Sequence, residues 1–310
     1  MSSSGQSVVL LGPQRQPILE EVVQSLDLDG PFATITAGWQ EREPDDDELD
    51  ALLDGQSVNL NLYARWHDVL DRDPEYAVAD RHQREVLDEL QELYLLRLDY
   101  ALGAVVMLQQ RRGSADLRTA AVAEAVEAVR ELDAAHLLRI GEVNGEFYER
   151  WPPHDRPVIA QHRAAVGRLL EGVTALVVAG GHVGVLVASM HLFNVAAALD
   201  APVIAWSAGA MALAEQVVLF HDRAVQGPGN PEVYGHGLSL LHGVVPLPHA
   251  AARLLLGDVG RMAVFAQRFA PARCVLLDAG SRVDVDLDGD VPVGTRVLDL
   301  GGAVSVVSES

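Results

Sequence analysis

The sequence has little cysteine, with Cys274 as the single one among 310 residues. A disulfide within the chain is therefore impossible, which fits a reducing, cytoplasmic compartment. The apolar run 273–277 around this cysteine indicates a buried strand, so the thiol is expected in the core. Residues 1–6 lack the charged start of a signal peptide, and no apolar stretch is long enough to span a membrane, so we expect no membrane partner.

Basic residues are also scarce, because 23 Lys and Arg residues stand against 44 Asp and Glu residues, for a net charge of -21. The basic residues form no stripe along the sequence, so the chain would repel the phosphate backbone of a nucleic acid. We therefore expect no nucleic-acid partner and interpret the negative charge as a source of solubility.

Motifs for metals and phosphates are missing too. The sequence has no group of His and Cys residues with the spacing of a zinc site, and no P-loop pattern. Residues 284–290 superficially resemble a calcium loop, but Thr295 stands where a bidentate glutamate is required. An Asp-Gly hairpin is the simpler interpretation of this segment. We expect no metal and no cofactor.

Hydrophobic residues, in contrast, make up 49% of the chain, which is enough for a large core. Short apolar runs alternate with helical patterns, and this alternation predicts an α/β fold with a doubly wound, mostly parallel sheet and flanking helices. The C-terminal part, 283–307, is expected to form a β meander. The other expected strands are 7–11, 31–36, 57–63, 175–178, 202–205, 238–245 and 273–277, and the expected helices include 17–26, 184–199 and 208–219.

The region 74–170 has a different character, because it is helical throughout. An apolar helical stripe includes Leu90, Tyr94 and Leu98, and residues 115–140 are rich in Ala and Glu with few helix breakers. We therefore expect a single α/β domain over 1–310 with a helical insertion at 74–170. The insertion would act as a lid, as the face of a homodimer, or as extra cover for the sheet.

A candidate nucleophile stands in residues 202–212, Pro-Val-Ile-Ala-Trp-Ser-Ala-Gly-Ala-Met-Ala, where an apolar strand runs directly into a small-residue helix. Ser207 lies at the junction, as a nucleophile elbow requires, and the helix N-terminus would supply N–H groups near a developing oxyanion. Ala205 replaces the first glycine of the usual G-x-S-x-G pattern. The alternative for Ser207 is an ordinary helix N-cap.

A glycine pair precedes this junction by one strand-helix unit. Gly180 and Gly181 follow a predicted strand and, with His182, open a helix, so backbone N–H groups there are free to face a ligand. Both loops are expected at the carboxyl ends of parallel strands, where ligands bind in α/β sheets. The aromatic segments 36–40 and 63–67 are expected either to line the same cleft or to cap the sheet.

The pairing of Gly180-Gly181 with Trp206-Ser207-Ala208-Gly209-Ala210 resembles the dipeptidase E and cyanophycinase family of serine peptidases, which have the class I glutamine amidotransferase-like fold. The resemblance covers about residues 173–285, with weaker support at the N-terminal strands.

This resemblance implies that Ser207 is the nucleophile and that the backbone N–H groups of Gly181 and Ala208 hold the oxyanion. Gly180, His182 and Trp206 would then contact the substrate. Because Cys274 does not stand at the elbow, a glutaminase that uses cysteine is disfavoured.

A serine nucleophile needs a base, which is most often histidine. Residues 237–245 resemble the family strand that precedes the catalytic histidine, and His249 follows in Val-Pro-Leu-Pro-His. We therefore predict His249 as the base. His242 and His221 are the alternatives, and His249 itself would otherwise be a histidine of a surface loop.

An acid is needed to orient the imidazole, and here the sequence departs from the family. Family members carry an Asp-Glu-Gly-Thr-like turn after a late strand, whereas this chain has Asp278-Ala279-Gly280-Ser281. Asp278 remains a candidate, and Asp222, fifteen positions after Ser207, is the other. A water in place of the acid, or an impaired enzyme, are the further alternatives.

These residues predict a serine hydrolase that cleaves a peptide or amide bond of a small substrate through an acyl-enzyme. A preference for acidic substrates would have to come locally, from basic residues such as His182, Arg253 or Arg261. The alternative function is that of a non-catalytic binding or scaffold protein of the same fold, because fold alone does not confer activity.

Overall fold

A computed structural model of the chain describes residues 7–223, 229–286 and 289–308. Residues 1–6, for which the sequence predicts no signal peptide, and two positions of the 284–290 segment lie outside this part. Within the described residues, no helix has both the length and the apolar character that crossing a membrane requires.

The central element is a six-stranded sheet in the described part of the chain, with the order β10-β1-β5-β4-β2-β3. All neighbouring strands are parallel except β10, which runs antiparallel to β1. This confirms the predicted α/β fold with a mostly parallel sheet. The strands are β1 (Val8–Leu11), β2 (Phe32–Ile35), β3 (Ser57–Asn59), β4 (Ala175–Val178), β5 (Val203–Trp206) and β10 (Arg282–Val285).

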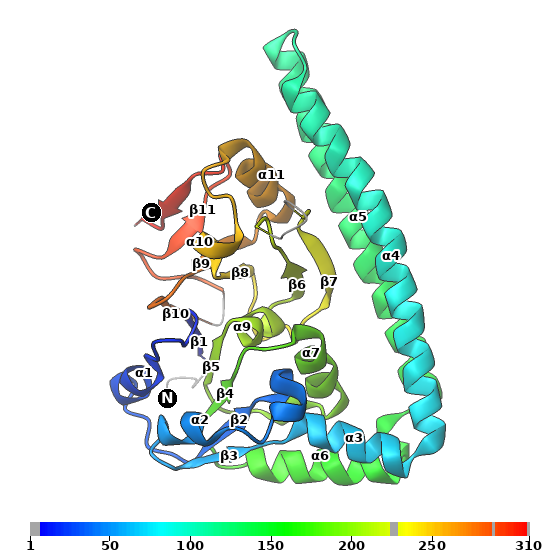
Figure 1. Ribbon diagram of the computed structural model, residues 1–310, viewed down its shortest axis with the longest axis vertical. Coiled ribbons are helices and arrows are strands. Elements are labelled where there is room, and N and C mark those ends of the chain that lie inside the picture. The colour runs from blue at the N-terminus through cyan, green and yellow to red at the C-terminus, as the bar shows by residue number, and fades with distance from the viewer. Residues whose placement is uncertain (1–6, 224–228, 287–288, 309–310) are drawn as a thin grey trace, which may run out of the picture.

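Helices cover both faces of this sheet, because successive strand residues point to opposite sides. Val9 and Ile204 pack with α1 and α2, whereas their neighbours Leu10 and Ala205 pack with the helices of the other face. Figure 1 shows the two layers. The helical elements around the sheet are α1 (Leu19–Ser25), η1 (Ala37–Arg42), α2 (Asp47–Ala51), α3 (Leu62–Arg72), α6 (Pro157–Leu170), α7 (Val183–Leu192), α8 (Val195–Ala198) and α9 (Ala208–Leu213).

A second sheet, of order β12-β11-β9-β8, follows in the C-terminal third of the described chain, beside a two-stranded β6-β7 sheet. Strands β8 and β9 are parallel, and Pro248 at the end of β8 is level with Leu277 at the end of β9. The elements are β6 (Gln216–Leu219), β7 (Glu232–His236), β8 (Val244–Pro248), α10 (Ala250–Arg253), α11 (Val259–Phe269), β9 (Arg273–Leu277), β11 (Arg296–Leu298) and β12 (Val304–Val306). The short helical element η2 (Pro153–Asp155) lies outside this region, directly before α6.

The predicted helix 208–219 is wrong in its second half, where β6 replaces it. The cause is tertiary. The carbonyls of Ala212 and Leu213 accept hydrogen bonds from Leu238 and Leu240, so they are engaged by another segment where a longer helix would use them itself. The strand expected at 238–245 correspondingly begins only at Val244.

The predicted strand 57–63 is also too long, because helix α3 begins at Leu62. Asn61 has a left-handed backbone conformation, which ends the strand. The two carboxylate oxygens of the buried Glu43 accept the N–H groups of Tyr63 and Ala64, both at 2.9 Å. The cap of α3 therefore comes from a residue about twenty positions away, and no local pattern signals it.

The predicted C-terminal meander is corrected as well. Strand β10 leaves this region and pairs with β1 in the central sheet, so that Val283 lies beside Leu10. Strands β11 and β12 pair with each other and extend the sheet of β9. The three strands are thus divided between two sheets.

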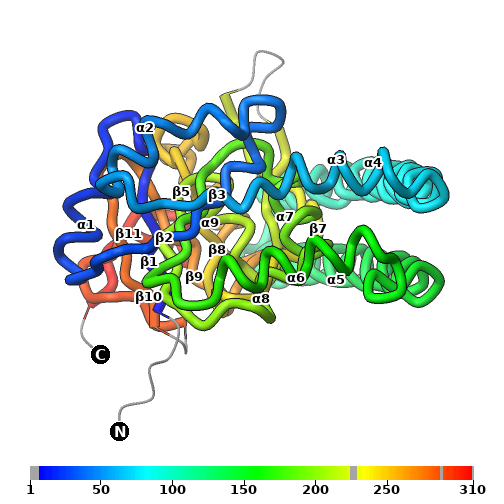
Figure 2. Tube along the Cα trace, turned by 90° about the horizontal axis from the view of Figure 1, so that it is seen from below, coloured from blue at the N-terminus to red at the C-terminus, as the bar shows by residue number. Residues whose placement is uncertain are grey.

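The long helices α4 (Pro74–Gln110) and α5 (Ala115–Arg150) form an antiparallel hairpin that projects past the rest of the molecule (Figure 1). Seen from below, the two helices lie side by side along one flank (Figure 2). Helix α6 differs from them, because its Ile159 and Val166 are fully buried in the core beneath the central sheet.

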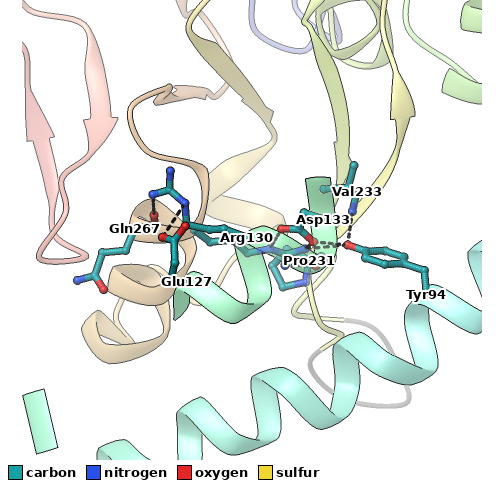
Figure 3. A network of polar contacts seen from close by, with 8 residues as sticks. Tyr94, Glu127, Arg130, Asp133, Pro231, Val233 and Gln267 are labelled. Carbon is teal, nitrogen blue, oxygen red and sulfur yellow. Dashed lines mark hydrogen bonds and ion pairs between the residues drawn. The ribbon is translucent and has the colours of Figure 1, made fainter. Parts of the chain in front are cut away.

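A buried polar cluster attaches the hairpin to α11. Arg268 of α11 donates to both oxygens of Asp133 on α5, at 2.6 and 2.7 Å, and to the Tyr94 hydroxyl on α4 at 2.8 Å. Tyr94 in turn donates to Asp133 and accepts the N–H of Val233 on β7. Figure 3 shows these contacts, which join four elements at one buried point.

Candidate active site

A cavity of about 650 Å³ opens at the carboxyl ends of the parallel strands. This is the edge at which doubly wound sheets bind their ligands. Its lining comes from the segments that follow β1, β2, β4, β5 and β8, and it contains most of the predicted site. Residues of the lining that bear on the chemistry of the site are Gln14, Arg15, Trp39, Glu48, Gly180, Gly181, Trp206, Ser207, Ala208, His249 and Arg253.

Ser207 stands between the last residue of β5 and the first residue of α9, with φ 52° and ψ -122°. A non-glycine residue at positive φ is held there by its surroundings, at a cost of about 1–3 kcal/mol. Its side chain makes no capping hydrogen bond to α9. An ordinary N-cap serine has an extended backbone and such a bond, so Ser207 does not have the conformation of an ordinary N-cap.

Small residues allow the strand, helix and glycine loop to approach one another here. A Cβ atom on Gly180 would lie 2.8 Å from Ser207 Cβ, and one on Gly209 would lie 2.4 Å from the Val178 carbonyl oxygen. Ala205, which replaces the expected glycine of the elbow pattern, is fully buried within β5 between Leu10 and Val178. A methyl group fits there because the position belongs to the strand and not to the turn.

The two N–H groups predicted for the oxyanion are those of Gly181 and Ala208. Neither has an acceptor among the residues that the structure describes. A Cβ atom on Gly180 would lie 3.6 Å from Ala208 N, so the glycine loop lies directly beside the turn between β5 and α9. Gly181 has φ 126° and its Cα faces the Gly38 carbonyl, where a side chain would not fit. Gly181 and Ala208, which carry the predicted donors, both line the cavity.

His182 has a different environment from the one expected of a substrate contact. Its backbone N–H donates to the Gly38 carbonyl at 2.7 Å, and its Nδ1 accepts the N–H of Val185 at 3.2 Å. The side chain thus caps α7, and His182 is absent from the described lining of the cavity.

His249 follows β8 directly and has a left-handed backbone with φ 56°. Its N–H donates to the Leu277 carbonyl on β9 at 2.9 Å, and its side chain lines the cavity. Burial, followed by the charges of Arg253 and Arg15, lowers the pKa of His249, against a smaller opposing effect of Asp278. The imidazole is therefore neutral near pH 7, which is the form that accepts a proton.

No side-chain hydrogen bond of Ser207 or His249 occurs within the described part of the chain, so the pair shares the cavity without a direct bond. The other histidine candidates lie elsewhere. His242 is exposed and pairs with Glu215 at 3.4 Å, and His221 is absent from the cavity lining.

The two acid candidates have different surroundings. Asp278 follows β9 as His249 follows β8, and its charge acts on the His249 imidazole. Its Oδ1 accepts the N–H of Ala251 at 2.8 Å, and its Oδ2 accepts from Arg296 at 3.0 Å. Asp278 therefore lies beside the segment that carries His249 and fixes the start of α10.

Asp222 is buried, and its hydrogen bonds are made to a different segment of the chain. Its Oδ1 accepts from Arg261 Nη2 at 2.6 Å, its Oδ2 accepts the N–H of Leu255, and its own N–H donates to the Arg253 carbonyl. Asp222 thus holds the chain around Arg253, and Arg261 is paired with it rather than facing the cavity. Of the two acids, Asp278 is the one whose charge reaches His249.

Sequence reasoning missed Arg15 and Glu48 in the cavity. Arg15 lies in the loop after β1, next to the predicted Gly-Pro turn, and the rule that ligands bind at carboxyl strand ends would have included it. Neither Arg15 nor Arg253 has an ion-pair partner in the residues described. From the sequence, the aromatic segments 36–40 and 63–67 are expected either to line the cleft or to cap the sheet. Trp39 of the first segment lines the cavity, whereas Trp66 of the second packs against Arg84 outside it.

The described residues contain no cluster of three His, Cys, Asp or Glu side chains placed to hold a metal ion. Within the described residues, the cavity brings together a serine at positive φ, a histidine whose pKa is lowered, two backbone N–H groups without a hydrogen-bond acceptor and two arginines, in a doubly wound α/β fold.

No protein-family model matches the sequence, and no curated protein matches it. Among solved structures, the chain is similar to a peptidase from an acI-B1 Actinobacterium, with 13% sequence identity and a TM-score of 0.46 over 98% of this chain and 94% of that one.

Proposed function

We propose that this protein is a serine hydrolase that cleaves a peptide or amide bond of a small substrate through an acyl-enzyme. The observation that most supports this is the positive φ of Ser207, at the start of α9 and on the wall of a cavity that His249 also lines. Residues held in sparsely populated backbone conformations tend to cluster at active sites, and Ser207 combines such a conformation with a place in the cavity lining.

In the proposed reaction, the Ser207 hydroxyl oxygen attacks the substrate carbonyl carbon while His249 accepts its proton. The negative oxygen of the tetrahedral intermediate is held by the N–H groups of Gly181 and Ala208. His249 then gives the proton to the leaving amine as the carbon–nitrogen bond breaks. A water molecule, deprotonated by His249, attacks the carbonyl carbon of the acyl-enzyme. The bond from this carbon to Ser207 Oγ breaks, and His249 returns the proton to Oγ, which releases the acid product and restores both residues.

The acids have supporting roles in this proposal. Asp278 acts electrostatically on His249 and holds α10 through Ala251, so it is a positioning residue. The hydrogen bond between Ser207 and His249 is expected to form when substrate excludes water, as catalytic hydrogen bonds often tighten in the bound complex.

Labelling with a fluorophosphonate, read by intact mass, tests the proposal. We expect one equivalent to add to the native protein and none to Ser207→Ala. Ser239→Ala is the matched control, because Ser239 also has a positive φ (53°) but lies outside the cavity lining. Equal labelling of the native protein and Ser207→Ala would refute Ser207 as the nucleophile.

A non-catalytic binding protein of the same fold is the second candidate. The observation that favours it is that both oxygens of Asp278 are already engaged by Ala251 and Arg296, which leaves the imidazole without a bonded acid in the described residues. This candidate predicts that the native protein binds small peptides in calorimetry but neither turns them over nor reacts with a fluorophosphonate.

A further inference from the structure

The free side of helix α4 exposes an apolar surface that the proposed hydrolase does not use. Leu96, Tyr100 and Met107 are 58%, 77% and 75% exposed. Residues 100–110 contain no charged side chain, although the protein as a whole carries a net charge of -21. Continuous apolar surface of this kind usually marks a site of interaction.

These side chains form one stripe along the helix. Leu96, Tyr100, Gly103 and Met107 are separated by four, three and four positions, which is the spacing of a helix–helix seam. Residues on the other side of α4, such as Tyr94, Leu98 and Leu102, are buried against α5 and the body. The stripe therefore points away from the rest of the molecule, and a Cβ atom on Gly103 would meet nothing within 4 Å.

We propose that this stripe binds the same stripe of a second copy of the chain, with the two α4 helices antiparallel. A twofold axis between Tyr100 and Gly103 then places the Tyr100 ring over the gap at the second copy's Gly103. The same register sets Leu96 against the second copy's Met107. Large side chains thereby meet small or flexible ones along the whole contact.

The charges beside the stripe favour this antiparallel direction. On the N-terminal side of the stripe, α4 carries only acids between positions 85 and 92, and the tip of the hairpin is basic. The acids are Glu85, Asp88, Glu89 and Glu92, and the tip contains Arg111, Arg112 and Arg118. Glu92 and Arg111 have no ion-pair partner in the residues described, and the proposed register makes each the partner of the other. A parallel pairing would place like charges together.

The area that the two helices bury determines how tightly the proposed dimer is expected to associate. From Glu92 to Arg111 a helix covers about 29 Å, and its width of about 10 Å gives a footprint of about 300 Å² per copy. Stable interfaces bury about 800 Å² per partner. The proposed dimer is therefore weak and concentration-dependent, and its ionic part weakens with salt. In each copy the body packs against the opposite side of α4, through residues such as Leu98 and Leu102, so it does not cover the stripe.

Sedimentation of the full-length protein, from micromolar to near-millimolar concentration at low salt, tests the proposal. We expect reversible dimerisation that Tyr100→Glu weakens by at least about tenfold. Val78→Glu is the control, because Val78 is 66% exposed on the same helix and lies eighteen residues, or five turns, before Leu96. It shares the face but lies outside the overlap, so its dimerisation should match that of the native chain.

A charge exchange tests the direction and register. Glu92→Arg and Arg111→Glu should each weaken the dimer, and the double variant should restore it. A native protein that stays monomeric over the whole range, or a double variant weaker than both single ones, would overturn the proposal. So would a monomer that instead binds vesicles of phosphatidylcholine and phosphatidylserine through this stripe, since the occupant would then be a membrane.

Discussion

At the residue scale, the charges around His249 determine the pH range in which the proposed base is neutral and can accept a proton. Burial lowers the pKa of this imidazole, and Arg253 and Arg15 lower it further. A lowered pKa means that the neutral form persists to a lower pH, so the acid limb of kcat/KM should fall below the ordinary histidine value of about 6.5.

Removing one of these charges should therefore shift that limb. We expect Arg253→Met to raise the pKa of His249 and to move the acid limb of kcat/KM, or of the fluorophosphonate labelling rate, to higher pH. Arg253→Lys is the control, since it keeps the charge and should leave the limb near its native position. A limb that moves equally in both variants would mean that the guanidinium acts by shape and not by charge.

The residues of the site differ in how far the sequence could predict them. Ser207, Ala208 and the Gly180-Gly181 pair were visible because each feature is contiguous in the sequence. The environment of Asp222 was not visible, because it is made by Arg261 and Leu255, more than thirty positions away. Arg15 differs from Asp222, because it lies in the loop after β1 and the rule that ligands bind at carboxyl strand ends would have included it.

At the element scale, the close packing of β4, β5 and α9 requires a residue without a side chain at Gly209. A Cβ atom on Gly209 would lie 2.4 Å from the Val178 oxygen and 2.7 Å from the Ala179 oxygen, both of which belong to the backbone. We therefore expect Gly209→Ala to lower the free energy of unfolding by about 3 kcal/mol, because the helix and strand must separate.

Urea denaturation measures this effect, with Gly167→Ala as the control. Gly167 lies in helix α6, and a Cβ atom there would meet nothing within 4 Å. The control should gain about 0.5–1 kcal/mol, since alanine favours a helix over glycine. If both variants were equally stable, the close approach at Gly209 would not be what stabilises the junction of β5 and α9.

The elements that sequence patterns predicted correctly are those whose pattern is local. Helices α4 and α5 follow from long segments with few helix breakers, and the central strands follow from short apolar runs. The errors at 57–63 and 208–219 share one cause, namely that distant groups, such as the Glu43 carboxylate, cap or end the element. Propensity contains no information about such tertiary hydrogen bonds.

At the scale of the whole molecule, α11 connects the hairpin to the candidate site. Its Arg268 holds Asp133 and Tyr94 of the hairpin, and its Arg261 holds Asp222, whose N–H binds the Arg253 carbonyl. The two arginines lie seven positions, about two helical turns, apart. One short helix thus fixes both the position of the hairpin and one wall of the cavity.

Removing one partner of the buried Arg268–Asp133 pair should therefore destabilise the protein more than replacing both partners with apolar residues. Removing one partner leaves an uncompensated buried charge, so we expect Asp133→Leu or Arg268→Met alone to lower the free energy of unfolding by about 3–5 kcal/mol. The double variant should cost less than either single change, because no charge is then left unpaired. Urea denaturation of the four proteins measures the coupling.

Hydrogen exchange identifies the elements that lose stability in these variants. In Asp133→Leu, amides of α4 and α5 near the cluster should exchange faster while those of β4 and β5 stay protected, because the central sheet has its own core on both faces. Fluorophosphonate labelling of Ser207 should persist in this variant. If the central strands lost protection together with the hairpin, the two parts would unfold as one cooperative unit, and the anchor would support the whole fold rather than the hairpin alone.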